Sequence, residues 1–326
     1  MLSRTAMGLF WMSRYVERAE NTARLLDAGR RMEALPATRA ERSTEWESIV
    51  IASGCKSTFP HDIEAATQDQ VVGHLFFDLD TPSSIASCLT AARENARAMR
   101  NAITSEVWDA TNEALARFRT MSPDAPHGDL AERLDWVKER GALVRGAIDG
   151  TLLRNEGYQF IELGKWLERM DATARLLDVK YHVLLPHAYE VGQGVDYLQW
   201  LQILRAAGAA RAYRHIYRRA IDAKGVADLL VLNPLSPRSL VTCSDGIAQS
   251  LTGVGVRLAP QRAVLNRAYA MRDALHRLSV DEIIEFGLHE WLTERIAEAN
   301  MLATEISKAY GFDAPLEAEE SQVQSQ

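Results

Sequence analysis

The sequence predicts an all-α fold, a helical bundle built from two homologous halves, and three observations lead to this prediction. Apolar residues recur at intervals of three and four, as in Leu9, Met12 and Val16, which is the pattern of an amphipathic helix. Alternation of period two never extends beyond a few residues, so strands are not expected. A motif of eleven residues also occurs twice along the chain, and this repeat predicts the two halves.

The first expected helix is the longest of the chain. Good helix formers dominate residues 2–35, so this helix would be ~50 Å long at ~1.5 Å per residue. Ser83 or Ser84 and the segment 279–281 suit helix N-caps, and Pro82 and Pro237 suit first-turn positions. Further helices are expected at 44–56, 82–103, 106–121, 130–154, 157–184, 197–221, 237–251, 260–278 and 281–310.

The repeated motif lies on two of the long predicted helices. Residues 17–27 (ERAENTARLLD) match residues 168–178 (ERMDATARLLD) at eight of eleven positions, with an offset of 151. Two shorter matches follow in the same order at offsets of 154 and 155, and the first of them aligns Trp46 with Trp200. Chance is a poor explanation for three ordered matches whose offsets drift by only four residues.

Domain boundaries follow from this repeat. We expect a first helical half at 1–155 and a second at 156–311, which is interlocked with the first as one domain about a pseudo-twofold axis. The last residues, 312–326, hold three glutamates and three glutamines, and we expect them to form a disordered acidic tail.

The motif places an acid and an arginine side by side in each half. Glu17 and Arg18 are neighbours in sequence and cannot pair well with each other on one helix, so each needs another partner. Across a pseudo-twofold axis, Glu17 would meet Arg169 and Glu168 would meet Arg18. One interpretation is a structural ion-pair network that holds the halves in register. The other is a cleft in which arginines clamp a carboxylate or phosphate and a glutamate accepts an amine.

A second group of charges lies on another predicted helix. Arg93, Glu94 and Arg97 form either a solvated face or a second wall of an anion-binding cleft. The second half has Ala248 and Gln249 in place of Arg93 and Glu94, so a site here would be asymmetric. The candidate catalytic residues are Glu17 and Glu168, and the candidate substrate-binding residues are Arg14, Glu17, Arg18, Asn21, Arg24, Arg93, Glu94, Arg97, Glu168, Arg169 and Arg175.

Composition narrows the function classes. A net charge of −7 disfavours general nucleic-acid binding, and no apolar run approaches the ~18 residues of a membrane span. Three cysteines cannot form a complete disulfide framework, which favours a reducing cytoplasm. The chain holds no phosphate-binding glycine loop and no Glu-x-x-His pair, so neither a cofactor nor a metal is expected.

One basic stretch departs from this acidic balance. Residues 205–224 hold six cations and one acid, with Tyr213 and Tyr217 interleaved. On an acidic protein we interpret this stretch as a solvated face or as a docking surface for an acidic partner, rather than as a nucleic-acid site.

The opening 27 residues, MLSRTAMGLFWMSRYVERAENTARLLD, resemble the start of the bacterial alpha-E family, all-α proteins named for a Glu-Arg motif. Residues 77–85 (FDLDTPSSI) and 233–239 (NPLSPRS) resemble other signatures of this family, and the similarity extends to about Gly311. The resemblance carries over only Glu17 and Arg18 by name. It implies association with an unusual, circularly permuted ATP-grasp protein, with a transglutaminase-like protein often encoded nearby, and hence peptide or amide-bond synthesis or modification.

Three functional hypotheses follow. The leading one is an accessory helical module of such an ATP-dependent system, which binds or presents a peptide or amino-acid substrate through a Glu/Arg-lined surface. The first alternative is an amide-forming or transfer enzyme in which Glu17 or Glu168 is a general base, which requires a raised pKa in a closed pocket. The second is a purely structural docking scaffold. A pocket at the motif favours the first two, whereas complete cross-pairing without a cavity favours the scaffold.

Overall fold

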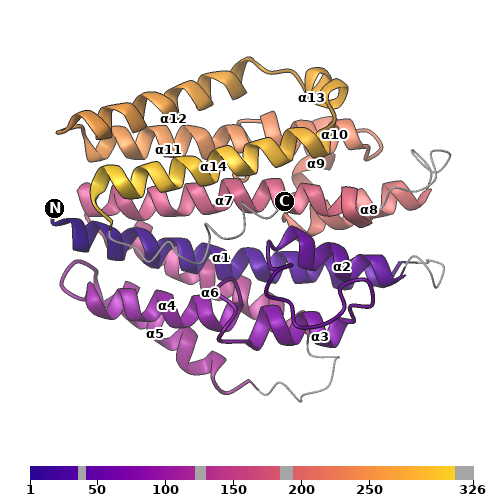
Figure 1. Ribbon diagram of the computed structural model, residues 1–326, viewed down its shortest axis with the longest axis horizontal. Helices are drawn as coiled ribbons and strands as arrows, with labels where there is room; N and C mark the ends of the chain where they lie inside the picture. Colours follow the sequence, from indigo (N-terminus) through magenta and orange to yellow (C-terminus); the bar gives the residue numbers. More distant parts are fainter. Residues whose placement is uncertain (36–41, 122–129, 184–193, 313–326) are drawn as a thin grey trace.

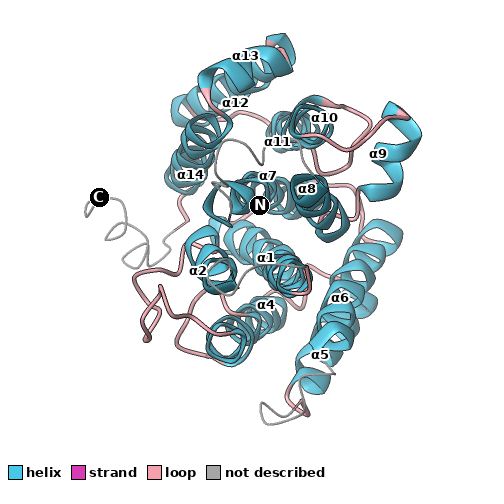
Figure 2. Cartoon of the chain, turned by 90° about the vertical axis from the view of Figure 1, so that its right-hand side faces the viewer, coloured by secondary structure: helices cyan, strands magenta, loops and turns pink. Residues whose placement is uncertain are grey.

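The computed structural model describes residues 1–35, 42–121, 130–183 and 194–312 of the chain. Helices joined by turns and short loops make up these ranges, and no strand occurs within them (Figure 2). The all-α prediction is therefore confirmed for the described part of the chain. Along the same ranges, no helix combines the length and the apolar character that crossing a bilayer requires.

Two long helices form the centre of the bundle. Helices α1 (Ser3–Glu33) and α7 (Glu156–Val183) lie side by side and pack on each other more extensively than any other pair (Figures 1 and 2). Helix α2 (Arg42–Ala52) follows α1 in the chain but packs mainly on α7, whereas α8 (Gly194–Ala206) follows α7 but packs mainly on α1. Each central helix is thus covered by the short helix that follows the other one in the chain, and residues of α1 and α7 belong to the same hydrophobic cluster.

The other long helices cover the two sides of this centre, and they are α4 (Ile85–Ala98), α5 (Ser105–Phe118), α6 (Leu130–Thr151), α11 (Leu240–Val254), α12 (Ala259–Arg277) and α14 (Leu288–Tyr310). Helices α4 and α6 lie on α1, and α5 packs against both of them. Helices α11 and α14 lie on α7, and α12 packs against both (Figure 1). Each central helix is thereby removed from water on most sides.

Two pairs of short helical elements are not predicted by the spacing of apolar residues. Helix α3 (Gln68–Val72) runs directly into a π-helical turn, η1 (Gly73–Phe77), and α10 (Ala223–Ala227) runs into a second such turn, η3 (Asp228–Leu232). The two pairs lie 155 residues apart along the chain. Five residues are too few for a helical period to be recognised, which explains why the sequence analysis assigns no helix to residues 68–77 or 223–232.

Serine caps fix where α4 and α11 begin. The hydroxyl of Ser84 accepts the backbone N–H of Ser87 at 3.0 Å, and the hydroxyl of Ser239 accepts that of Thr242 at 3.1 Å. The N-cap expected at Ser83 or Ser84 is therefore confirmed as Ser84. The first-turn positions expected for the prolines at 82 and 237 are wrong, because each proline lies two residues before its N-cap.

Glycines divide two helices that the sequence predicted as continuous. The predicted helix 197–221 ends its first part before Gly208, where φ is +73°, and resumes as α9 (Ala210–Tyr217). The predicted helix 281–310 is divided at Gly287, with φ of +105°, into α13 (Val280–Phe286) and α14. Glycine adopts these left-handed conformations at little cost, so both positions end a helix.

Large side chains fill the core around the central helices. Trp46 and Trp200, which the sequence analysis aligned with each other, are both buried. Phe312 was expected to begin the disordered tail, but it is buried and its ring lies 5.4 Å from that of Phe10 and 5.8 Å from that of Phe160. The remaining residues of that predicted tail, 313–326, lie outside the described part.

The closest approach of α1 and α7 depends on a glycine. A β-carbon added to Gly164 of α7 would lie 2.4 Å from the backbone oxygen of Phe10 on α1. Because this neighbour is backbone rather than a flexible side chain, the two helices would have to move apart to admit even a methyl group.

We therefore expect Gly164→Ala to lower the free energy of unfolding by ~1–3 kcal/mol, as overpacking in a dense core does. Chemical denaturation followed by circular dichroism measures this change. Gly146→Ala is the matched control, because a β-carbon at this exposed position of α6 would meet nothing within 4 Å. It should raise the stability by up to ~1 kcal/mol through helix propensity. Equal stabilisation by both substitutions would contradict the close approach.

Candidate functional site

The repeated Glu-Arg motif lies where α1 and α7 pack together. Arg169 of α7 donates from Nε and Nη2 to the two carboxylate oxygens of Glu17, at 2.8 and 2.9 Å. Arg18 of α1 donates from Nε and Nη2 to the two oxygens of Glu168, at 2.6 and 3.1 Å. Each pair is bidentate, which is the strongest arrangement of these two groups. The reciprocal pairing expected from the sequence is present.

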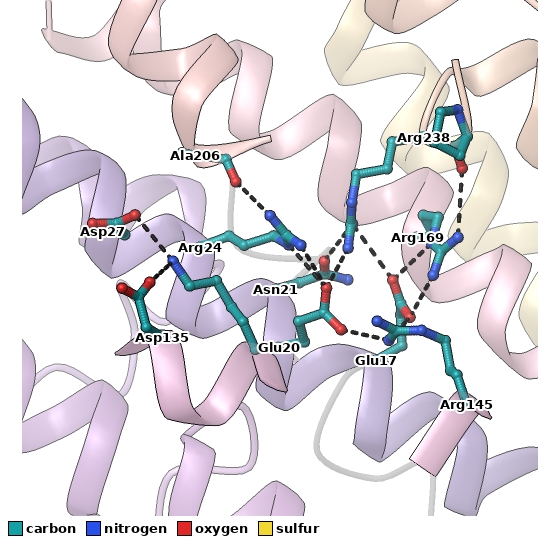
Figure 3. A network of polar contacts seen from close by, with 12 residues as sticks. Glu17, Glu20, Asn21, Arg24, Asp27, Asp135, Arg145, Arg169, Ala206 and Arg238 are labelled. Atoms are coloured by element: carbon teal, nitrogen blue, oxygen red, sulfur yellow. Dashed lines mark hydrogen bonds and ion pairs between the residues drawn. The ribbon is translucent and has the colours of Figure 1, made fainter. Parts of the chain in front are cut away.

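Two further arginines surround the carboxylates on the α1 side (Figure 3). Arg145 of α6 lies 3.0 Å from Glu17 through Nη1 and also contacts Glu20. Arg238, from the loop before α11, donates to Glu20 at 2.5 Å and to the side-chain oxygen of Asn21 at 2.9 Å. Both arginines were missed by the sequence analysis. The only signal was that Arg238 belongs to the 233–239 segment of the family resemblance, whereas Arg145 is one of many charges on α6.

The carboxylate of Glu168, on α7, binds a second arginine from α1. Arg14 of α1 donates from Nε to Glu168 at 2.9 Å, next to the two bonds from Arg18. The guanidinium carbon of Arg14 also lies 4.8 Å from the centre of the Trp11 ring, a cation–π contact that holds the arginine in place. Both oxygens of Glu168 are thereby engaged.

The second acid of each motif binds an arginine one turn later. Arg24 donates to Glu20 at 3.0 and 2.8 Å, and Arg175 donates to Asp171 at 2.7 Å. Both are i,i+4 pairs along one helix. In each arginine, Nη1 takes no part in the pair and points across the bundle.

This Nη1 atom reaches the end of a helix, α8 for Arg24 and α2 for Arg175. Arg24 donates to the backbone oxygen of Ala206, the last residue of α8, at 2.8 Å, and Arg175 donates to that of Ala52, the last residue of α2, at 3.4 Å. The final carbonyls of a helix have no partner within it, so a cation there is stabilising. The motif therefore fixes α2 and α8 as well as α1 and α7.

Burial and charge act in opposite directions on the acids of the network. Glu17, Glu20 and Glu168 are only 1%, 0% and 4% exposed. Burial raises the pKa of Glu168, but the charges of Arg18 and Arg14 outweigh it and lower the pKa to about 2. Burial likewise raises the pKa of Glu17, and Arg169 and Arg238 hold it well below its usual range. Both carboxylates are thus ionised at neutral pH and poor proton acceptors.

Positive charge exceeds negative charge in this network. Burial lowers the pKa of Arg238 to about 10, which is still high enough for the guanidinium to stay charged at neutral pH. Seven arginines meet four carboxylates, and these residues are Arg14, Arg18, Arg24, Arg145, Arg169, Arg175, Arg238, Glu17, Glu20, Glu168 and Asp171. The excess fits the lowered pKa values of Glu17 and Glu168, because nearby cations favour the ionised form.

The second group of predicted site residues lies apart from this network. Arg93 donates to Asn112 of α5 at 3.1 Å and to Glu94 at 2.6 Å, and Arg97 donates to Glu94 at 2.9 Å. The guanidinium carbon of Arg93 lies 5.6 Å from the Trp108 ring centre. Glu94 is therefore shared by both arginines, which leaves this group with one excess positive charge, and within the described residues the group makes no ion pair with the motif.

A small apolar cavity lies between α1, α4, α5 and α6. Its volume is about 10 Å³, which holds one water molecule at most. It is too small for an amino acid or a peptide. Its lining residues are Val16, Ala19, Leu89, Ala92, Thr111, Ala114, Val137, Arg140, Gly141 and Val144. Across the described ranges, no three metal-binding side chains gather closely enough to hold a metal ion.

We expect Glu168→Gln to lower the free energy of unfolding at pH 7 by ~3–5 kcal/mol, because Arg14 and Arg18 would lose their buried counter-charge. The effect depends on pH. The folded-state pKa lies below the ordinary value, so ionised Glu168 stabilises the fold above about pH 4.5, and this contribution disappears as pH falls toward 2. The stability difference between wild type and variant should therefore shrink over that interval. Urea denaturation at several pH values measures it.

The control for this variant is Glu94→Gln, which removes an ion-paired but exposed carboxylate. It should change the melting temperature very little, because solvent screens the pairs that it breaks. A Glu168→Gln protein that is as stable as the Glu94→Gln protein would show that the buried pairs do not hold the bundle together.

Two of the relatives that match this chain carry the description "uncharacterized protein". An uncharacterized protein of Mycobacterium bovis and one of Mycobacterium tuberculosis are each 25% identical to it over 320 residues. The matches cover 90% of this chain but 35% of each relative, so the chain spans about a third of the length of the curated relatives that it matches. No solved structure matches the chain.

A family model that matches this chain describes a helical domain with a Glu-Arg motif, the motif that lies between α1 and α7 in the structure. The matching family is described as "a predicted alpha-helical domain with a conserved ER motif", and the match extends over residues 1–310. Glu17-Arg18 and Glu168-Arg169 are Glu-Arg pairs within that range. The chain belongs to the alpha-E family.

Proposed function

We propose that this alpha-E chain is a cytoplasmic accessory module of an ATP-grasp-dependent system for peptide or amide-bond synthesis or modification. In this proposal the Glu-Arg network is the scaffold of the module, and the outer helices contact the partners. One observation carries the assignment of the scaffold role: the carboxylates of the motif are buried and their oxygens are engaged by arginines from the opposite helix.

The chemistry of the carboxylates favours this scaffold over an enzyme with a glutamate base. A general base works best when its pKa is near the operating pH. The pKa of Glu168 is about 2, and that of Glu17 is lowered too, so both carboxylates bind protons weakly at neutral pH. The arginine donors that would clamp a substrate carboxylate or phosphate are already bound to these acids.

The ATP-using partner is proposed from the family resemblance. That resemblance implies a circularly permuted ATP-grasp protein, with a transglutaminase-like protein as a further candidate. The match to about a third of longer relatives supports the idea of a module, since in those proteins the helical segment is joined to additional sequence. ATP would be used by the partner, while this chain would bind the partner or present a peptide or amino-acid substrate to it.

We further propose that the module arose by duplication, with halves at 1–155 and 156–311 related by a pseudo-twofold axis. The two pairs of short elements 155 residues apart support it. So do the positive φ angles of Gly54 and Gly208, at 75° and 73° and 154 residues apart. The reciprocal bonds of the Glu-Arg motif are a third line of support, because a twofold axis between α1 and α7 generates such pairs.

The proposed role is tested by reconstitution with a circularly permuted ATP-grasp protein from the same organism, the kind of partner that the family resemblance implies. We expect the two proteins to coelute in size-exclusion chromatography and to form an amide product, seen by mass spectrometry, at least about tenfold faster together than the ATP-grasp protein alone. The helical chain alone should release no ADP and form no amide.

Amide formation by this chain alone would contradict the accessory role. An ATP-grasp protein that is equally active with and without the chain would contradict the partnership.

A further inference from the structure

The outer face of α9 carries arginines that pair with no acid in the described part of the chain. Arg211, Arg214 and Arg218, which together we call the α9 basic surface, are exposed and follow one another at intervals of three and four residues. Arg211 and Arg214 therefore lie on one face of the helix, with Arg218 at its end. None of the three makes an ion pair with another described residue.

Some other arginines do have an acidic partner. Arg97 and Arg257 are exposed and Arg272 is half-buried, and their nitrogen–oxygen distances to a carboxylate are 2.7, 3.3 and 2.7 Å. Even beside the α9 basic surface, Arg219 pairs with Asp222 at 3.3 Å. The three arginines thus leave a local positive charge on a protein whose net charge is −7.

The local fold gains nothing from two of these arginines. Arg211 lies in the first turn of α9, where the positive end of the helix dipole disfavours a cation. Arg218 ends the helix with φ of +50°, a left-handed conformation in which glycine is much less strained. Departures from local helix rules point to a role for the side chains themselves.

The inner face of α9 holds this surface rigidly. Tyr213 is fully buried, and its hydroxyl donates to the backbone oxygen of Ala220 at 3.0 Å. Tyr217 bonds through its hydroxyl to the carboxylate of Asp228, at the start of η3. The tyrosines interleaved with the arginines therefore face the protein and are committed to internal bonds.

We propose that the α9 basic surface is a docking site for an acidic polypeptide segment of a partner protein. Three fixed arginines over a helix ~12 Å long suit a few neighbouring carboxylates. A nucleic acid fits less well, because its bases stack on exposed aromatic rings and these tyrosines are turned inward. The acidic remainder of the chain would also repel a long polyanion. The proposal does not depend on the identity of the ATP-using partner.

Binding of a fluorescent oligoglutamate peptide, followed by anisotropy, tests the site. The triple variant Arg211→Gln, Arg214→Gln, Arg218→Gln should weaken binding about tenfold, with the loss growing smaller at high salt. The matched control is Arg97→Gln, Arg257→Gln, Arg272→Gln, which removes the same charge from arginines with acidic partners and should weaken binding less than about twofold.

A single substitution separates binding from folding. Arg218→Gly should keep or raise the melting temperature, because glycine tolerates the positive φ. The same variant should lower the affinity for the peptide by about two- to threefold, because it removes one positive charge. Unchanged peptide affinity in this variant, or equal losses in the two triple variants, would overturn the proposal. So would a wild-type protein that does not bind the peptide.

Two other occupants are distinguished in the same assay. Tighter binding of a single-stranded oligonucleotide of equal charge, lost in the triple variant, would assign the surface to nucleic acid and overturn the proposal. A chain ending at residue 312 lacks the acidic residues 313–326. We expect this truncation to leave the affinity for the peptide unchanged. A severalfold increase in affinity would show that the chain's own end occupies the surface and would overturn the proposal of a partner segment.

Discussion

The arrangement of the whole bundle depends on two carboxylates that meet arginines from the opposite central helix. Glu17 and Glu168 are removed from water, which is costly unless each charge is paired and hydrogen-bonded. Bidentate pairing of this kind tolerates little displacement, so it specifies how far α1 and α7 slide and rotate against each other. Helices α4, α6, α11 and α14 then pack on a centre whose register is already set.

Glu168 and Glu17 are each surrounded by more than one arginine, but these arginines come from different elements. Arg14 completes the surroundings of Glu168, whereas the equivalent Lys165 binds Glu162 at 2.6 Å on its own helix. The carboxylate of Glu17 instead receives arginines from α6 and from the loop before α11. Similar electrostatic demands have thus been satisfied with unlike side chains, and this asymmetry is the kind of divergence that an ancient repeat would accumulate.

Much of the architecture could be predicted because long amphipathic helices have a strong period. The repeated motif also gave the partners of Glu17 and Glu168 correctly, since adjacent residues on one helix cannot satisfy each other. Helix ends were less accessible, because Gly208 and Gly287 divide segments whose apolar pattern continues through them. The sequence could not place Arg238, which reaches the network from a loop. Nor could it tell whether the motif was buried or lined a cleft, since both require the same residue types.

The packing of α2 and α8 on the opposite central helices has a consequence during synthesis of the protein. Helix α2 leaves the ribosome early, yet it packs mainly on α7, which is synthesised much later. The hydrogen bond from Arg24 of α1 also has to wait for its acceptor, the backbone oxygen of Ala206. The amino-terminal helices therefore keep apolar surface uncovered until roughly two thirds of the chain has been translated. The packing of α2 on α7 and of α8 on α1 thus joins residues that are far apart in sequence. Such contacts form later than local ones, and the uncovered apolar surface leaves the nascent chain exposed to aggregation until then.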